Sequence, residues 1–252
     1  MRVVLVGAGP GDPELLTLRA VRLLGEADVV LYDRLIDLRV LSFCTKDCLL
    51  VPVGKNPFCR TGLQNEINTL LVEYARKFPL VVRLKGGDPS VYGRANEEIE
   101  FLARQGIACE IVPGVTAACA SAAELGISLT DRDIASSVVF LTGHRKAGTP
   151  FQGMNVQGRT CVVYMGVSEA GNIVQAFLDA GNDPDLPAAI VASASYPSAQ
   201  VFTGSLGNVQ RIIDENEIVS PAALVLGEVV RRREEFADLR RSFAPDRFSL
   251  KG

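Results

Sequence analysis

The chain has 252 residues, of which 48% are hydrophobic and 22% charged, a composition typical of globular proteins. Its net charge of −3 argues against general nucleic-acid binding, which usually requires a basic surface. No run of eighteen apolar residues is present, and the strand-like start Met1–Gly7 lacks the apolar region and cleavage site of a signal peptide. We therefore expect a cytoplasmic protein with neither a nucleic-acid nor a membrane partner.

The first half of the chain alternates apolar, β-branched runs with helical stretches. Strands are predicted at Arg2–Val6, Asp28–Tyr32, Leu49–Val53, Leu80–Leu84 and Cys109–Val112. Helices are predicted at Glu14–Glu26, Leu63–Lys77, Arg94–Gln105 and Val115–Glu124. Strands that are apolar throughout and separated by helices indicate a parallel sheet covered on both faces.

The pattern changes after Glu124, where residues 126–134 are polar and without periodicity, as in a linker. Beyond it, strands are predicted at Ser137–Thr142, Thr160–Met165, Ala188–Ser193, Gln200–Thr203 and Ala222–Val229, with helices at Ser168–Ala180 and Leu206–Asn216. The mixed charges of Arg231–Glu235 are interpreted as a solvated surface. The fold class is therefore α/β, with domains at residues 1–125 and 135–252 and a cleft between them for a small molecule.

Two glycine loops follow predicted strands. The first, Gly7–Pro13, has Asp12 where the dinucleotide fingerprint needs its third glycine, and Pro10 has no N–H to offer a phosphate, so a nicotinamide site is disfavoured. The second, Lys85–Arg94, repeats the Gly-Asp-Pro triplet. Either loop alone could be a tight turn, but two at the carboxyl ends of parallel strands predict one ligand crevice.

Charged side chains also occur at predicted strand ends. Asp33 ends the second strand and Lys55 the third, where an acid and an amine could serve as a general base and its partner. Basic residues at or near strand ends, which suggest a polyanionic substrate, are Arg34, Lys55, Arg60, Arg83, Lys85, Arg94 and Arg145. Taken singly, each of these charges also fits a solvated loop. His144, the sole histidine, is expected to form hydrogen bonds at the cleft.

The six cysteines contain no C-x-x-C pair and are interpreted as buried free thiols. Cys44 and Cys48 have the spacing of half a zinc site, but no second pair follows, so we expect no metal.

Several motifs together resemble those of the tetrapyrrole methylases. They occur in order over nearly the whole chain, from about Val3 to Arg233, and are Val6–Thr17, Tyr32-Asp33, Val53–Lys55, Arg83–Pro89, Val112–Ala118, Thr142–His144, Tyr164–Gly166 and Ser220–Ala222. The resemblance implies a two-domain α/β enzyme, usually a homodimer, that binds S-adenosylmethionine between its domains. It further implies methylation of uroporphyrinogen III at C2 and C7, giving precorrin-2 for sirohaem, cobalamin or haem d1.

The resemblance also implies site residues. Asp33 matches the proton acceptor and Lys55 the proton donor. The positions that match cofactor contacts are Pro10, Gly86, Gly87, Asp88, Val91, Thr116, Ala117, Met165, Ala194 and Ala222. Substrate carboxylates are expected to meet Arg34, Arg83, Arg94 and His144.

The sequence departs from the family pattern at four places. Ser90 replaces Phe, Ala95-Asn96 replaces a Gly-Gly pair, Asp131 replaces His, and Ala194 replaces Gly. Three alternatives stay open: a methylase acting on a later precorrin, a nicotinamide-dependent oxidoreductase, and a binding module without catalysis.

Overall fold

The structure of the protein is a computed structural model that describes residues 1–53, 64–144 and 148–243, with side chains as far as residue 237. The chain folds as two compact units, Met1–Ala120 and Ser121–Gly252. In the described part of the chain, no helix is both long enough and apolar enough to cross a membrane.

The first unit contains a five-stranded sheet in the order β3-β2-β4-β1-β5, and every strand pair is parallel, as predicted. The strands lie within about two residues of the predicted bounds: β1 (Arg2–Gly7), β2 (Val29–Asp33), β3 (Leu49–Val53), β4 (Leu80–Lys85) and β5 (Ala108–Val112). Because all the strands run in one direction, their carboxyl ends meet at one rim, where ligands of such sheets bind.

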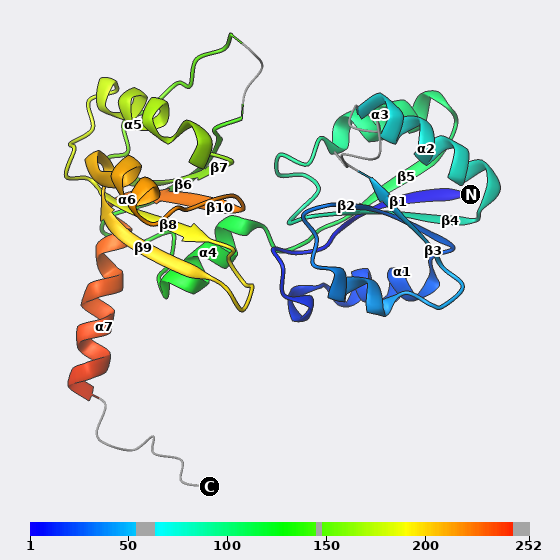
Figure 1. The fold of residues 1–252 in the computed structure, drawn as a ribbon, viewed down its shortest axis with the longest axis horizontal. Helices are drawn as coiled ribbons and strands as arrows, with labels where there is room; N and C mark the ends of the chain where they lie inside the picture. Colours follow the sequence, from blue (N-terminus) through cyan, green and yellow to red (C-terminus); the bar gives the residue numbers. More distant parts are fainter. Residues whose placement is uncertain (54–63, 145–147, 244–252) are drawn as a thin grey trace, which may run out of the picture. The chain divides into compact units, whose positions relative to one another are not determined.

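Helices cover both faces of this sheet, which explains why its strands are apolar on both sides. Helix α1 (Leu18–Glu26) packs on one face, and α2 (Gln64–Lys77) and α3 (Ala95–Arg104) pack on the other (Figure 1). Thr17 starts α1 by accepting the backbone N–H of Ala20 at 3.1 Å. Helix α4 (Ala117–Leu125) follows β5.

The second unit contains a mixed sheet in the order β6-β7-β10-β8-β9, in which only β6 and β7 are parallel. Its strands are β6 (Ser137–Thr142), β7 (Arg159–Tyr164), β8 (Pro187–Ala192), β9 (Gln200–Ser205) and β10 (Ala222–Leu226). Helices α5 (Ala170–Asp179) and α6 (Val209–Glu215) bury Ile173, Phe177 and Ile213 against one face of the sheet.

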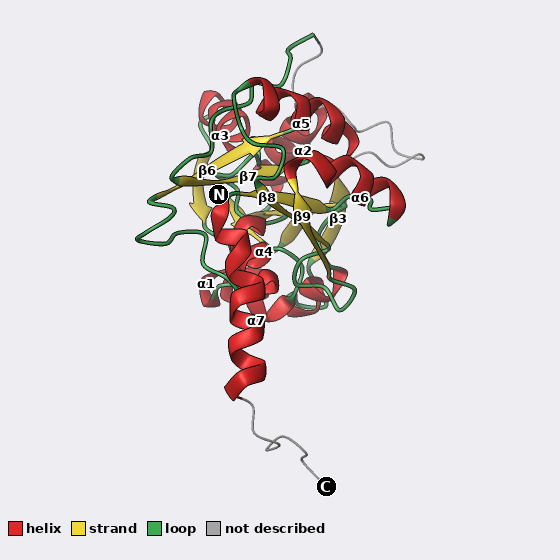
Figure 2. Cartoon of the chain, turned by 90° about the vertical axis from the view of Figure 1, so that its left-hand side faces the viewer, coloured by secondary structure: helices red, strands yellow, loops and turns green. Residues whose placement is uncertain are grey.

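Three helical segments were not predicted. One of them, the 3-10 helix Glu228–Arg231, overlaps the end of the strand predicted at Ala222–Val229, which stops at Leu226. Residues Leu38–Phe43 form a short 3-10 helix capped by Asp37, and the segment interpreted as a solvated tail forms helix α7 (Arg232–Phe243). Helix α7 runs away from the sheet of the second unit (Figure 2) and offered no apolar stripe to reveal it. Its first turn is nevertheless anchored, because the Arg232 guanidinium lies 3.3 Å from the Asp131 carboxylate.

That ion pair accounts for one departure from the family pattern. The Asp133 backbone N–H and Arg232 both lower the pKa of Asp131, so an acid is well accommodated where the family has His. Asp131 also forms a short bridge with Ala135. The predicted linker at residues 126–134 thus contains ordered contacts, and the proposed boundaries at 125 and 135 stay a prediction.

Candidate active site

Three glycine loops meet at the carboxyl end of the first sheet. Gly7 ends β1, Gly87 follows β4, and Gly114 follows β5. A Cβ on Gly7 would lie 2.6 Å from the Gly114 nitrogen, and one on Gly114 would lie 2.3 Å from the Gly87 oxygen. No side chain fits between backbones this close, so glycine is required there.

Hydrogen bonds lock the first two loops together. The Gly87 N–H donates to the Gly9 oxygen at 2.7 Å, and the Gly9 N–H donates back at 3.2 Å. Gly9 and Gly87 have φ angles of +73° and +66°, in the left-handed region that favours glycine. The two Gly-Asp-Pro loops therefore lie together, and the ligand crevice predicted for them stays a prediction.

Asp88 ties the second loop to the third. One carboxylate oxygen accepts the Gly114 N–H at 3.0 Å, and the other accepts the Ser90 N–H at 2.7 Å and the Ser90 hydroxyl. Ser90, one of the departures, therefore contributes to holding the loop. Because protein donors already engage both oxygens, the Asp88 side chain shapes the loops, and its predicted contact with a cofactor is untested.

The remaining predicted cofactor contacts of this unit are available at the same rim. Gly86 is exposed, its φ is ordinary, and a Cβ built on it would meet no atom within 4 Å. The other predicted contacts, in or next to the three glycine loops, are partly exposed: Pro10, Val91, Thr116 and Ala117. The loops therefore present open backbone, as a ligand that approaches the main chain requires.

Asp33, at the end of β2, is a second carboxylate at this rim, besides Asp88. Its Oδ1 accepts the Arg83 Nη2–H at 2.5 Å, while about a third of its side chain (33%) stays exposed. The 3-10 helix that follows is capped by Asp37, so Asp33 is not needed as a helix cap. Asp33 is thus an ion-paired carboxylate that solvent and small molecules can reach.

Behind Asp33 lies a buried charged cluster that we define as Arg83 and Lys85 of β4 and Glu98 of α3. Their side chains are only 2%, 4% and 0% exposed. Glu98 Oε1 accepts the Lys85 ammonium at 2.8 Å, the Gln64 amide at 3.1 Å and Arg83 Nε at 3.3 Å. Burial lowers the pKa of Lys85, Arg83 adds to this effect, and Glu98 and Asp33 oppose it.

The cluster corrects one prediction. Arg83 was expected to bind substrate, but its guanidinium is buried and engaged by Asp33, Glu98 and the Leu84 carbonyl. The Arg83 guanidinium is therefore not placed to contact a ligand directly. Glu98, the third member of the cluster, was not among the residues predicted for the site.

The other basic candidates divide into exposed and undescribed residues. Arg34 is exposed beside Asp33. Arg94 is exposed as well, but its guanidinium lies 2.6 Å from the Glu97 carboxylate, which raises the pKa of Arg94. Lys55, Arg60 and Arg145 lie outside the described residues.

The second unit gathers the remaining predicted cofactor contacts at one end of its sheet. Met165 follows β7, Ala194 follows β8, and Ala222 begins β10, which lies antiparallel between these two strands. The Ser193 N–H donates to the Pro221 oxygen at 2.8 Å. Positive φ angles occur at Ser193 (49°) and Ser195 (68°) but not at Ala194, so alanine replaces the family's glycine without backbone strain.

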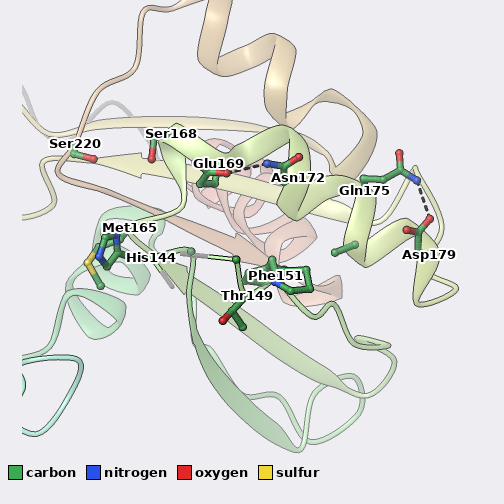
Figure 3. Close-up of a pocket in the computed structure, with 14 residues that line it drawn as sticks. His144, Thr149, Phe151, Met165, Ser168, Glu169, Asn172, Gln175, Asp179 and Ser220 are labelled. Carbon is green, nitrogen blue, oxygen red and sulfur yellow. Dashed lines mark hydrogen bonds between the residues drawn. The ribbon is translucent and has the colours of Figure 1, made fainter. Parts of the chain in front are cut away.

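A pocket of about 850 Å³ opens beside this end of the second sheet (Figure 3). His144, Met165 and Ser220 line one part, and the α5 side chains Asn172 and Gln175 line another. Among the described residues, no arginine or lysine lines this pocket. His144 is exposed, and its backbone N–H donates to the Thr142 hydroxyl at 3.2 Å.

The cysteines differ in part from prediction. Cys161 is buried and Cys44, Cys48 and Cys109 are half-buried, but Cys119 on α4 is exposed, so the expectation of buried thiols is wrong there. Cys59 lies outside the described residues. Burial raises the pKa of Cys44 and of Cys109 to about 12, which keeps these thiols protonated at neutral pH. Among described residues, no group of three or more potential metal ligands comes together.

Glycine loops and a carboxylate at the carboxyl end of a parallel sheet define an α/β protein with a small-molecule site. A family model described as tetrapyrrole (corrin/porphyrin) methylases matches residues 2–210. The chain therefore belongs to the tetrapyrrole methylase family.

Similar proteins agree with this assignment. A siroheme synthase of Pseudomonas aeruginosa is 46% identical over 93% of this chain and 51% of the relative, and one of Acinetobacter baylyi is 46% identical over 92% and 52%. The chain thus spans about half the length of these curated relatives. The native crystal structure of uroporphyrin III C-methyl transferase from Thermus thermophilus is 44% identical, with a TM-score of 0.78 over 92% of this chain and 94% of that one. Its complex with S-adenyl homocysteine is 45% identical, with a TM-score of 0.79 over 92% and 100%.

The glycine junction generates a first prediction. Replacing Gly7→Ala should destabilise the protein by about 1–3 kcal/mol or more, because the new methyl group meets backbone atoms that cannot move independently. Gly86→Ala is the matched control at the same rim and should leave stability unchanged or slightly higher. Denaturant unfolding of both variants checks this, and equal stabilities would show that the loops are not tightly joined.

Proposed function

We propose that this chain transfers methyl groups from S-adenosylmethionine to C2 and C7 of uroporphyrinogen III, giving precorrin-2. The observation that carries the proposal is the convergence of three glycine loops beside the exposed carboxylate of Asp33. The Thermus thermophilus methyltransferase, 44–45% identical over nearly its full length, supports the same reaction. We further propose a cytoplasmic homodimer.

The open loop backbone fits the methyl donor. The exposed main chain at Gly86 leaves room for a ligand, and we propose that Pro10, Gly86, Gly87, Val91 and the Thr116-Ala117 pair contact the cofactor. Met165, Ala194 and Ala222 of the second unit belong to the same proposal. When bound, S-adenosylmethionine supplies a methyl group activated by its sulfonium. The protein's task is then to orient the acceptor carbon and exclude water.

Asp33 is proposed as the proton acceptor. A pyrrole carbon becomes a better nucleophile as its ring N–H is lost, and the partly exposed Asp33 carboxylate can take up that proton. Arg83 is proposed to hold the carboxylate rather than the substrate, since its guanidinium is buried against it. Lys55 remains the proposed proton donor, and Arg34, Arg94 and His144 the proposed contacts for substrate carboxylates.

The alternatives carry less support. A later precorrin as substrate is favoured only by the likeness to a cobalt precorrin-4 methyltransferase, which shares the fold with a TM-score of 0.80 but is 25% identical. The nicotinamide-dependent alternative gains nothing, because the Asp12 side chain accepts the Glu14 backbone N–H and begins a short helix where that fingerprint has glycine.

The proposed reaction is tested by incubating the protein with S-adenosylmethionine and uroporphyrinogen III. Mass spectrometry should show a product that has gained two methyl groups. Methylation of a later precorrin alone, with uroporphyrinogen III unchanged, would instead favour the alternative substrate.

Replacing Asp33→Asn should slow turnover by roughly 10²–10⁴-fold while both ligands still bind, because an amide cannot accept the proton. Single-turnover methyl transfer at saturating ligands measures this, with the melting temperature recorded alongside. Asp37→Asn is the control, since it removes another ion-paired aspartate of the same loop, 2.8 Å from Arg39. An Asp33→Asn rate within about threefold of wild type would remove this residue from the mechanism.

Gly86→Val should abolish binding of S-adenosylhomocysteine, measured by calorimetry, without unfolding the protein, because the side chain enters open space at the loop. Gly87→Val tests the loop less cleanly, since its φ of +66° adds strain. Gly106→Val is the matched control for that strain, with a φ of +71° and no atom within 4 Å of its Cβ. If folded Gly86→Val binds S-adenosylhomocysteine with unchanged affinity, this loop is only a turn and does not contact the cofactor.

A further inference from the structure

Two members of the buried charged cluster, Lys85 and Glu98, have no part in the methyl transfer proposed above, and the third, Arg83, holds the Asp33 carboxylate. Charged side chains are almost never fully buried unless paired, and transferring such a group out of water carries a large desolvation penalty. Here three of them occupy the interior between β4 and α3. Apolar residues would fill such a space with no desolvation penalty, so the cluster points to a role other than packing.

The contacts run from Glu98 to Asp33 through one guanidinium. Glu98 Oε1 accepts Arg83 Nε at 3.3 Å, and the Leu84 carbonyl accepts Arg83 Nη1 at 3.2 Å. These two acceptors fix the plane of the guanidinium, because its donors have a rigid geometry. The third nitrogen, Nη2, then points at Asp33 Oδ1, 2.5 Å away.

Lys85 and Gln64 fix Glu98 in turn. The Lys85 ammonium donates to Glu98 Oε1 at 2.8 Å and the Gln64 amide donates at 3.1 Å. Glu98 Oε2 is buried and finds no hydrogen-bond partner among the residues that the structure describes. With Asp33, the four side chains carry two positive and two negative charges. Asp33 alone is substantially exposed, at 33%. The buried support therefore carries one net positive charge, which the accessible Asp33 carboxylate balances.

We propose that Glu98 is a positioning residue for Asp33, acting through Arg83, with Lys85 balancing its charge. The inference rests on the proposed role of Asp33 as proton acceptor. An amide at position 98 keeps an acceptor oxygen but loses the negative charge that strengthens the hydrogen bonds from Arg83 and Lys85. The Arg83 guanidinium is then held less firmly, and the direction of the Asp33 oxygens is less well defined. Misplacement of a reacting group by about 1 Å can cost on the order of 10²-fold in rate.

The test is a double-mutant cycle between Glu98→Gln and Asp33→Asn. Alone, Glu98→Gln should lower kcat by roughly 10- to 100-fold and leave KM for both substrates within about threefold. In the Asp33→Asn background it should change the residual kcat by less than about threefold, because it acts only through the missing carboxylate. A merely structural residue would lower the rate by the same factor in both backgrounds, and that result would overturn the proposal.

Two further variants keep the result interpretable. Leu102→Ala removes a fully buried side chain one turn further along α3 and should reduce the stability of the protein. At temperatures below its melting transition, this variant should keep the kcat of the wild type. If Glu98→Gln does not fold, the double variant Glu98→Gln/Lys85→Met takes its place in the cycle, because it removes one buried charge of each sign.

The outcomes also separate this inference from the function on which it rests. If the Asp33→Asn variant turns over slowly but folded Glu98→Gln has a normal kcat, only the positioning role of Glu98 is overturned. A normal rate in Asp33→Asn would overturn the assignment of the base, and the positioning role with it.

Discussion

The rim of the first sheet depends on how closely three backbones approach one another. Gly7 and Gly114 leave no room for a Cβ, because each lies against the other's backbone and against the Gly87 oxygen, so the loops after β1, β4 and β5 are packed main chain against main chain. The Gly114 N–H donates to the Asp88 carboxylate, and hydrogen bonds between Gly9 and Gly87 further hold these loops together. The open backbone at Gly86 is a result of that packing.

Strand register places the carboxylate beside this junction. Leu31 of β2 pairs with Arg83 of β4, so Asp33, two residues further on, shares the sheet face of Arg83 and Lys85. Shifting β4 by one residue would turn both cations toward the α1 face, into the apolar cluster that contains Val82 and Leu84. A single register thus determines both the apolar core and the surroundings of Asp33.

Local patterns predicted much of this structure. The strands agree with the predicted bounds within a few residues, because each is a short apolar run bounded by turn residues such as glycine. The contact between the glycine loops followed from the parallel sheet. Helix α7 was missed because the charged run Arg231–Glu235 fits a solvated surface as well as a helix.

The buried cluster was harder to predict because charge alone does not reveal burial. Arg83 and Lys85 alternate with apolar residues, which fits a polar rim equally well, and Glu98 stands among the surface acids Glu97 and Glu100. One signal was present, since Ala95, Glu98 and Leu102 share the buried face of α3 at helical spacing. Their partners come from distant parts of the chain, and only the tertiary fold brings them together.

The end of α4 matters for anyone who wishes to divide this polypeptide. The chain passes from one compact unit to the other between Ala120 and Ser121, inside that helix. Its final carbonyls, at Glu124 and Leu125, accept hydrogen bonds from the Arg233 side chain at 3.1 and 2.7 Å. Separate expression of the second unit should therefore start upstream of Ala117 and extend beyond Arg233, because a fragment cut at either place loses part of the helix or its cap.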